Sequence, residues 1–270
     1  MSDIFSFKRF GNFFVSDFKR CLANYGLSLL ILSLTGLMAY LITIFVSLIF
    51  GFGYNVPGIA ERWVILAFAF FIMALTIPAK CYGYITNKRS GSAYTLLPVS
   101  SMEKLISMLL NTAIIIPAIF LIVYVSVDYV IFLLDPNVTV PLFTTEIVDF
   151  ISQVKFMTEG TEVESFTNPF AQIDDHVILM STFLLGAICF KRAKVARTIL
   201  VIIVVSSILG SILGPIIYHS IDLTTLTEEQ IALSVFNNVD KFVLIDIISD
   251  ILMLIALVWG LFYRIKTIKY

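Results

Sequence analysis

Residues 27–50 read LSLLILSLTGLMAYLITIFVSLIF and contain no charged side chain. A helix of this length, rising about 1.5 Å per residue, crosses the roughly 30 Å hydrocarbon core of a bilayer. Residues 63–84 form a second stretch of the same kind, in which Lys80 near the end is the one charged residue. These two stretches predict that the chain is embedded in a membrane.

Four more apolar stretches follow, at about residues 105–134, 170–190, 196–218 and 242–263. The chain is 59% hydrophobic and 14% charged, and its mean hydropathy is +0.97. A soluble domain cannot cover that much apolar surface, because much of a globular surface must stay polar. We therefore expect an all-α integral membrane fold, a single transmembrane domain over residues 1–270 with six transmembrane helices.

Basic residues gather in alternate connections between these stretches. If the N-terminus is cytoplasmic, 15 of the 18 Lys and Arg residues lie on the cytoplasmic side, and Arg62, Lys155 and Lys241 lie outside. Connections rich in Lys and Arg stay on the cytoplasmic side of a membrane. This distribution predicts that both termini are cytoplasmic.

The same topology assigns a side to each connecting segment. Residues 85–104 become a cytoplasmic loop, and residues 135–175 and 219–241 become extracytoplasmic segments. Within these two segments, apolar residues at helical spacing predict short surface helices near 147–154 and 227–239. They are either helices resting on the outer surface or a binding surface for a partner.

Residues 1–24 predict an amphipathic helix that lies in the headgroup plane of the cytoplasmic leaflet. This helix either anchors the chain or docks a cytoplasmic partner through its cationic face. Its apolar stripe is Phe7, Phe10, Phe14 and Phe18, and its opposite face carries Lys8, Arg9, Lys19 and Arg20.

The cytoplasmic loop reads NKRSGSAYTLLPVSSMEKL from Asn87 to Leu105. Ser100 and Glu103 form a capping box that starts the third helix, and Pro98 stops any helix from continuing into it. This leaves residues 94–97 as a short apolar element. An ordinary loop with a helix cap explains these residues without any further role.

Leu97-Pro98-Val99-Ser100, followed by Glu103-Lys104-Leu105, resembles the Leu-Pro-Val-Ser motif of type-2 ABC exporter permeases. In that family the motif also lies between the second and third spans, and the six spans, cytoplasmic termini and N-terminal amphipathic helix match as well. The resemblance departs from the family after Ser100, where Ser101 and Met102 replace a frequent Arg. The larger outer segment here also follows the third span rather than the fifth.

The resemblance implies a membrane subunit of an ATP-driven exporter in the bacterial cytoplasmic (inner) membrane. Its partners would be a separate nucleotide-binding ATPase subunit, a second permease chain (identical or paralogous) and the lipid bilayer. It also implies that the cytoplasmic loop couples to the ATPase through Tyr94, Leu96, Leu97, Pro98, Val99, Ser100 and Glu103.

Small residues mark possible close helix contacts. Gly210 and Gly214 are four residues apart in the fifth span, and Gly36 lies on a small and polar stripe of the first. Such residues let two helix backbones approach closely in a membrane. The contact is either within one chain or between two, and the resemblance implies pairing through the first and fifth spans.

Asp246 and Asp250 lie one turn apart in the sixth span. A carboxylate at the bilayer centre costs on the order of 3 kcal/mol, so each needs a reason to be there. Asp250 is either a proton, cation or cargo contact or a structural hydrogen-bond partner. The first option would make the chain an ion-coupled secondary transporter, which is an alternative to the exporter.

Other chemistry is missing from the sequence. No phosphate-binding loop or hydrolase motif is present, and His176 and His219 are isolated at predicted outer helix ends as solvated interfacial residues. A net charge of −1 argues against nucleic acid as a partner. We therefore expect no enzyme activity, cofactor or metal in this chain. A membrane scaffold or sensor that presents its acidic outer segments is a further alternative.

Overall fold

The computed structural model describes residues 5–143, 155–158, 161–164, 169–220 and 239–267. Helices account for most of these residues, so the predicted α-helical fold is confirmed. The first half contains α1 (Phe7–Ser33), α2 (Thr35–Ile49), α3 (Ile59–Tyr82), the 3₁₀ turn η1 (Gly83–Thr86), α4 (Lys88–Thr95), α5 (Ser101–Leu109), the π-helical turn η2 (Leu110–Ile115) and α6 (Ile116–Leu134). The second half contains β1 (Lys155–Thr158), β2 (Thr161–Glu164), α8 (Pro169–Cys189), α9 (Lys194–Ser220) and α11 (Val239–Thr267).

Within the described residues, four helical stretches are long and apolar enough to cross a membrane. They are Phe7–Ile49, Ile59–Thr86, Ser101–Leu134 and Ile248–Thr267. The chain is thus a multi-pass membrane protein. The helices α8 and α9 are 21 and 27 residues long.

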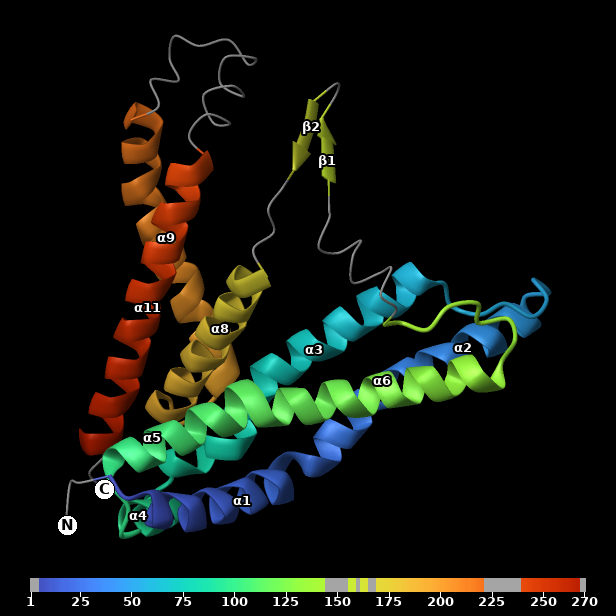
Figure 1. Ribbon diagram of the computed structural model, residues 1–270. Coiled ribbons are helices and arrows are strands. Elements are labelled where there is room, and N and C mark those ends of the chain that lie inside the picture. Colours follow the sequence, from blue (N-terminus) through green and yellow to red (C-terminus); the bar gives the residue numbers. More distant parts are fainter. Residues whose placement is uncertain (1–4, 144–154, 159–160, 165–168, 221–238, 268–270) are drawn as a thin grey trace.

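The helices form two groups that diverge from a common base (Figure 1). The helices α1, α2, α3 and α6 run side by side in one group, and α8, α9 and α11 form the other. The groups are joined where α3 contacts α8 and α5 contacts α11. The core at this junction is fully buried and includes Met73 and Ile77 of α3, Phe120 of α6, and Met180 and Leu184 of α8.

The start of α1, the helix α4, the start of α5 and the end of α11 all lie at one end of the molecule (Figure 1). We call this the basal end, and the opposite end, where α2 ends and α3 begins, the distal end. The segments with most of the basic residues therefore meet at the basal end, as the charge pattern predicted. Lys194 at the start of α9 joins them there, since its ammonium donates to the Gly83 carbonyl and to Thr86 Oγ1.

The N-terminal helix differs from the prediction in its extent. No boundary occurs at residue 24, because α1 continues to Ser33 and breaks at Leu34 before α2 begins. Its buried face repeats every fourth residue and consists of Phe13, Asp17, Cys21, Tyr25, Leu29 and Ser33. Phe7 of the predicted apolar stripe is 84% exposed.

The third predicted helix contains an irregular turn with an identifiable cause. Pro117 has no backbone N–H, so the carbonyl of Ala113 loses its partner in the helix. The backbone forms the π-helical turn η2 at this place, and His176 Nε2 of α8 lies 3.2 Å from the Ala113 carbonyl oxygen. His176 is half-buried, and its ring centre lies 5.0 Å from that of Phe70, with the two rings tilted at 42°. The prediction of a solvated interfacial histidine was therefore wrong.

The segment after α6 contains a feature that the all-α prediction missed. Strands β1 and β2 form an antiparallel hairpin in which Phe156 pairs with Val163 and Lys155 with Glu164. The predicted short helix near 147–154 lies outside the described residues. So does the one near 227–239, apart from Val239, which begins α11.

Two buried carboxylates tie the distal end together. Asp128 pairs with Arg62 at 2.9 Å and also accepts the backbone N–H of Leu142. Asp135 accepts the hydroxyls of Tyr40 at 2.6 Å and Tyr54 at 2.7 Å. These donors, together with the backbone N–H of Asn137, hold the pKa of Asp135 well below its usual range.

Candidate functional site

The predicted capping box at the start of α5 is confirmed. The backbone N–H of Glu103 donates to Ser100 Oγ at 3.2 Å, and the backbone N–H of Ser100 donates to Glu103 Oε2 at 2.9 Å. Each residue thereby satisfies one N–H that the first turn of a helix leaves free. Ser100, the last residue of the motif Leu97–Ser100, is therefore fixed to the first turn of α5.

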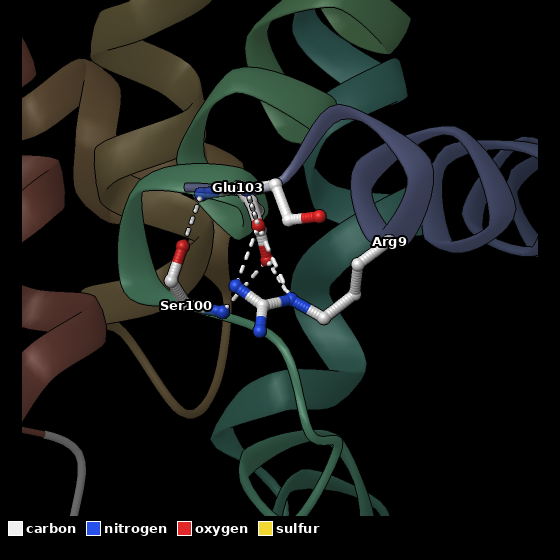
Figure 2. A network of polar contacts seen from close by, with 4 residues as sticks. Arg9, Ser100 and Glu103 are labelled. Carbon is white, nitrogen blue, oxygen red and sulfur yellow. Dashed lines mark hydrogen bonds and ion pairs between the residues drawn. The ribbon is translucent and has the colours of Figure 1, made fainter. Parts of the chain in front are cut away.

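The carboxylate of Glu103 also reaches the N-terminal helix (Figure 2). Arg9 donates through Nη2 to Oε1 at 2.7 Å and through Nε to Oε2 at 2.9 Å. The backbone N–H of Ser6, the residue that precedes α1, donates to Oε1 at 2.8 Å. One fully buried carboxylate therefore caps the starts of both α1 and α5. We call Ser6, Arg9, Ser100 and Glu103 the basal latch.

The hydrogen bonds between Arg9 and Glu103 in the latch are of a strong kind. A guanidinium and a carboxylate joined by two N–H donors have charge assistance and fixed geometry. Glu103 has no exposed surface, while the Arg9 side chain is 30% exposed. Removing Arg9 would leave the buried carboxylate of Glu103 without its counter-charge. The latch therefore joins the end of the loop at Ser100 to the start of the N-terminal helix.

The loop residues divide into an inner and an outer set. Tyr94 is 3% exposed and packs against Phe13 of α1 and Tyr84 of η1. Burial raises the pKa of Tyr94 well above its ordinary value, so the phenol stays neutral. Leu96 is 75% exposed, and Pro98 is exposed beside it. Of the predicted coupling residues, Leu96 and Pro98 therefore present a surface, and Tyr94 and Glu103 support it.

A groove lies between α1 and the loop motif. Its volume is about 560 Å³. Its apolar wall comes from Phe13 and from Leu97, Pro98 and Val99, and its polar wall from Arg9, Asn12, Ser16, Asp17 and Arg20. The groove therefore combines an apolar wall from the loop with a polar and charged wall from α1.

The sequence did not reveal Arg9 and Ser6 as members of the site. The signal was present in the charge pattern, because Glu103 is one of very few acidic residues in the basal segments and α1 offers four cations. Matching that carboxylate to a cation on the N-terminal helix would have suggested the latch. It would not have selected Arg9 among the four.

The glycines that were predicted to pack against another helix have different surroundings in the structure. An added Cβ at Gly36 would lie 3.0 Å from the Tyr124 ring, so this glycine serves a contact within the chain. Gly210 is exposed with no other atom near its would-be Cβ. Gly214 lies in α9, and its surroundings are outside the described part. A glycine that the sequence did not single out, Gly186, packs against Thr198, and a Cβ there would lie 2.9 Å from the Cβ of Thr198.

The predicted intramembrane carboxylates both lie in α11. Asp250 falls inside the apolar stretch Ile248–Thr267 and is half-buried. The surroundings of the Asp246 side chain are outside the described residues. Neither carboxylate belongs to the basal latch. Within the described residues, no group of three His, Cys, Asp or Glu side chains could hold a metal ion.

Comparisons with protein-family models, with curated proteins and with solved structures find no match to this chain.

Proposed function

We propose that this chain is the membrane-spanning permease subunit of an ATP-driven exporter of the type-2 ABC class. It has no ATPase of its own and couples to a separate nucleotide-binding subunit at the basal end. The basal latch carries this proposal. It joins the Leu-Pro-Val-Ser motif to α1, so a push on the exposed loop would move the N-terminal helix as well.

The exposed part of the loop supports a docking role. An apolar side chain that is 75% exposed in an aqueous loop, as Leu96 is, has a use if a partner covers it. Phe7, at 84% exposure on the neighbouring α1, adds to the same basal surface. Buried Tyr94 and Glu103 hold that surface in one conformation, which lowers the entropy lost on binding.

The proposed topology has six spans with both termini in the bacterial cytoplasm. Four helical stretches are long and apolar enough to cross a bilayer, and α8 and α9, at 21 and 27 residues, would supply the fifth and sixth spans. The basal end gathers the basic segments, so it would face the cytoplasm and its anionic leaflet.

A dimer, of identical or paralogous chains, fits the exposed helices. Apolar residues Leu41 and Phe45 of α2 are at least half exposed, and Ile203 and Ile208 of α9 are as well. Lipid or a second permease chain would cover them. Gly210, which is open on α9, would allow a close approach of the second chain.

The test is co-purification of the tagged full-length protein in mild detergent, with Leu96→Asp and Phe52→Asp as a matched pair. Phe52 is 78% exposed at the distal end, so it offers the same kind of change away from the loop. An ATPase subunit should accompany the wild type and Phe52→Asp and be lost with Leu96→Asp. Absence of any ATPase, or equal behaviour of the two variants, would contradict the proposal.

The ion-coupled alternative predicts the opposite dependence of transport on the ATPase. It requires that Asp250→Asn abolish transport while removal of the ATPase has no effect. Asp250 is half-buried within an apolar helix, where a carboxylate is costly, so Asp250→Asn tests whether that carboxylate is needed for transport. For the exporter, loss of the ATPase must stop transport.

A further inference from the structure

A second polar cluster lies directly above the basal latch on the same helices. Asp17 of α1 follows Arg9 by two turns, and Ser107 of α5 follows Glu103 by one. Tyr82 of α3 and Asn111 of η2 complete the group. Asp17 is 2% exposed and the other three have no exposed surface. We call these four residues the Asp17 cluster.

The donors of the cluster converge on one oxygen of Asp17. Tyr82 OH donates to Oδ2 at 2.8 Å, Ser107 Oγ at 2.7 Å and Asn111 Nδ2 at 3.4 Å. None of these three donors carries a charge. The positive charge of Arg20 on α1 acts on Asp17, but the guanidinium of Arg20 donates its hydrogen bond to Tyr84. A carboxylate that is withdrawn from water and hydrogen-bonded to neutral donors alone is far from fully compensated.

The other oxygen of the carboxyl group has no hydrogen-bond partner. Asp17 Oδ1 is buried and unpartnered, and so is the amide oxygen of Asn111 in the same cluster. Buried polar atoms nearly always have a partner, so two unsatisfied acceptors in one cluster call for a missing donor. A proton on the carboxyl group is the smallest donor that the site could take.

Other titratable groups do not supply this donor. Arg20, one turn along α1, directs its Nη1 to Tyr84 OH at 2.9 Å. The remaining titratable groups in this region are thiols and phenols, together with one ammonium, which lies 5.2 Å from the Tyr94 ring centre. They are Cys21 on α1, Cys81 and Tyr82 on α3, Tyr84 on η1, Tyr94 on α4 and Lys104 on α5.

We infer that Asp17 is a proton-binding site, occupied on Oδ1 while Oδ2 accepts the three donors that join α1 to α3 and α5. The proton comes from solvent, one O–H bond forms, and no other covalent bond changes. Asp17 also lines the groove beside residues 97–99, which provides a route from the basal surface. The occupied site is neutral and turns an unpartnered acceptor into a donor. Loss of the proton leaves a buried charge at the contact of α1 with α3 and α5, on which the basal latch depends.

The test is infrared spectroscopy of the full-length protein in nanodiscs between about pH 5 and about pH 8, a range above the ordinary titration of aspartate. The C=O stretch of a protonated carboxylic acid should be present in the wild type and lost in Asp17→Asn. Ser107→Ala should shift that band to higher frequency, because the carbonyl loses a hydrogen bond. Ser126→Ala, at an exposed serine bonded only to its own helix, should leave the band in place.

Ser107→Ala keeps the inference testable if Asp17→Asn does not fold. A wild-type spectrum without the protonated carboxyl band throughout this range would overturn the inference. So would a band that neither Asp17→Asn nor Ser107→Ala alters. The inference concerns the protonation of the folded chain alone, so the result does not depend on whether an ATPase binds.

Discussion

Arg9 and Glu103 are separated by 94 positions in the sequence, yet two guanidinium nitrogens of Arg9 contact both carboxylate oxygens of Glu103. The same carboxylate receives the backbone N–H groups that precede α1 and α5. Two helix starts therefore share one anchor. The end of the loop between α4 and α5 is therefore joined to the N-terminal helix through this carboxylate.

Loss of the carboxylate charge should loosen this anchor. We expect Glu103→Gln to lower the free energy of unfolding by about 2 kcal/mol, since Arg9 loses its ion pair within a buried network. Thermal unfolding in detergent measures this loss. Hydrogen exchange should also speed up at the start of α1 or of α5, because glutamine keeps only one acceptor oxygen for the backbone N–H groups of Ser6 and Ser100.

Glu61→Gln is the matched control for that change. Glu61 also caps its own helix, at the distal end, but its contact to the Gly58 backbone is exposed. An exposed change of this kind should cost within about 0.5 kcal/mol. Equal melting temperatures of Glu103→Gln and Glu61→Gln would contradict the stabilising role of the latch.

A methyl group on Gly186 should disrupt the contact of α8 with α9. The added carbon would overlap the side chain of Thr198, which is 3% exposed and has nowhere to move. We expect Gly186→Ala to cost about 3 kcal/mol by overpacking. Gly210→Ala, on an open face of α9, should be neutral or slightly stabilising because alanine favours helix.

Thr198→Ala provides the rescue for this pair. It removes the hydroxyl and methyl groups that would meet the added carbon, so the double variant should melt above Gly186→Ala alone. Non-additivity of this sign identifies the two residues as direct neighbours. A double variant with the summed loss of the two single changes would contradict the contact.

Acid should weaken the distal end through Asp135. The folded protein holds the pKa of this carboxyl well below its unfolded value, so the associated stability is present above about pH 4 and is lost as the pH falls toward the folded pKa. Thermal unfolding measured from about pH 6 downward should show this loss. Asp135→Asn and Tyr54→Phe should each flatten the dependence, because each removes part of the interaction that depresses the pKa.

Labelling of engineered thiols should establish the orientation. Cys189 is exposed and would add background, so the variants should be made with Cys189→Ser. A thiol at exposed position 55 of the distal end should react with an impermeant reagent applied to intact spheroplasts. A thiol at position 89 of α4 should react only after rupture. The reverse pattern would overturn the proposed topology and the docking site with it.

The long apolar helices and their shared charged end could be read from the sequence, because hydropathy and basic residues are local signals. The capping box of Ser100 and Glu103 is equally local, since its members lie within one turn. The pairing of Glu103 with Arg9 depends on how α1 folds back onto α5. No periodicity encodes that contact.

The other differences from the sequence-based predictions also come from contacts between residues that are distant in the sequence. Tyr94 belongs to a loop that the sequence describes as short and apolar, but packing against Phe13 and Tyr84 turns its ring inward. His176 looked solvated because its own helix gives it no partner. Gly186 was overlooked because its partner, Thr198, lies across a helix contact rather than on the same helix face.

The proline that interrupts the third apolar helix has a consequence for biogenesis. A carbonyl exposed to hydrocarbon must find a donor, and the Ala113 carbonyl finds one in His176 of a helix synthesised 60 or so residues later. Until α8 enters the bilayer, this helix carries an unsatisfied dipole. The insertion machinery or water would have to shield it. The third apolar helix is therefore fully hydrogen-bonded only after α8 has been inserted.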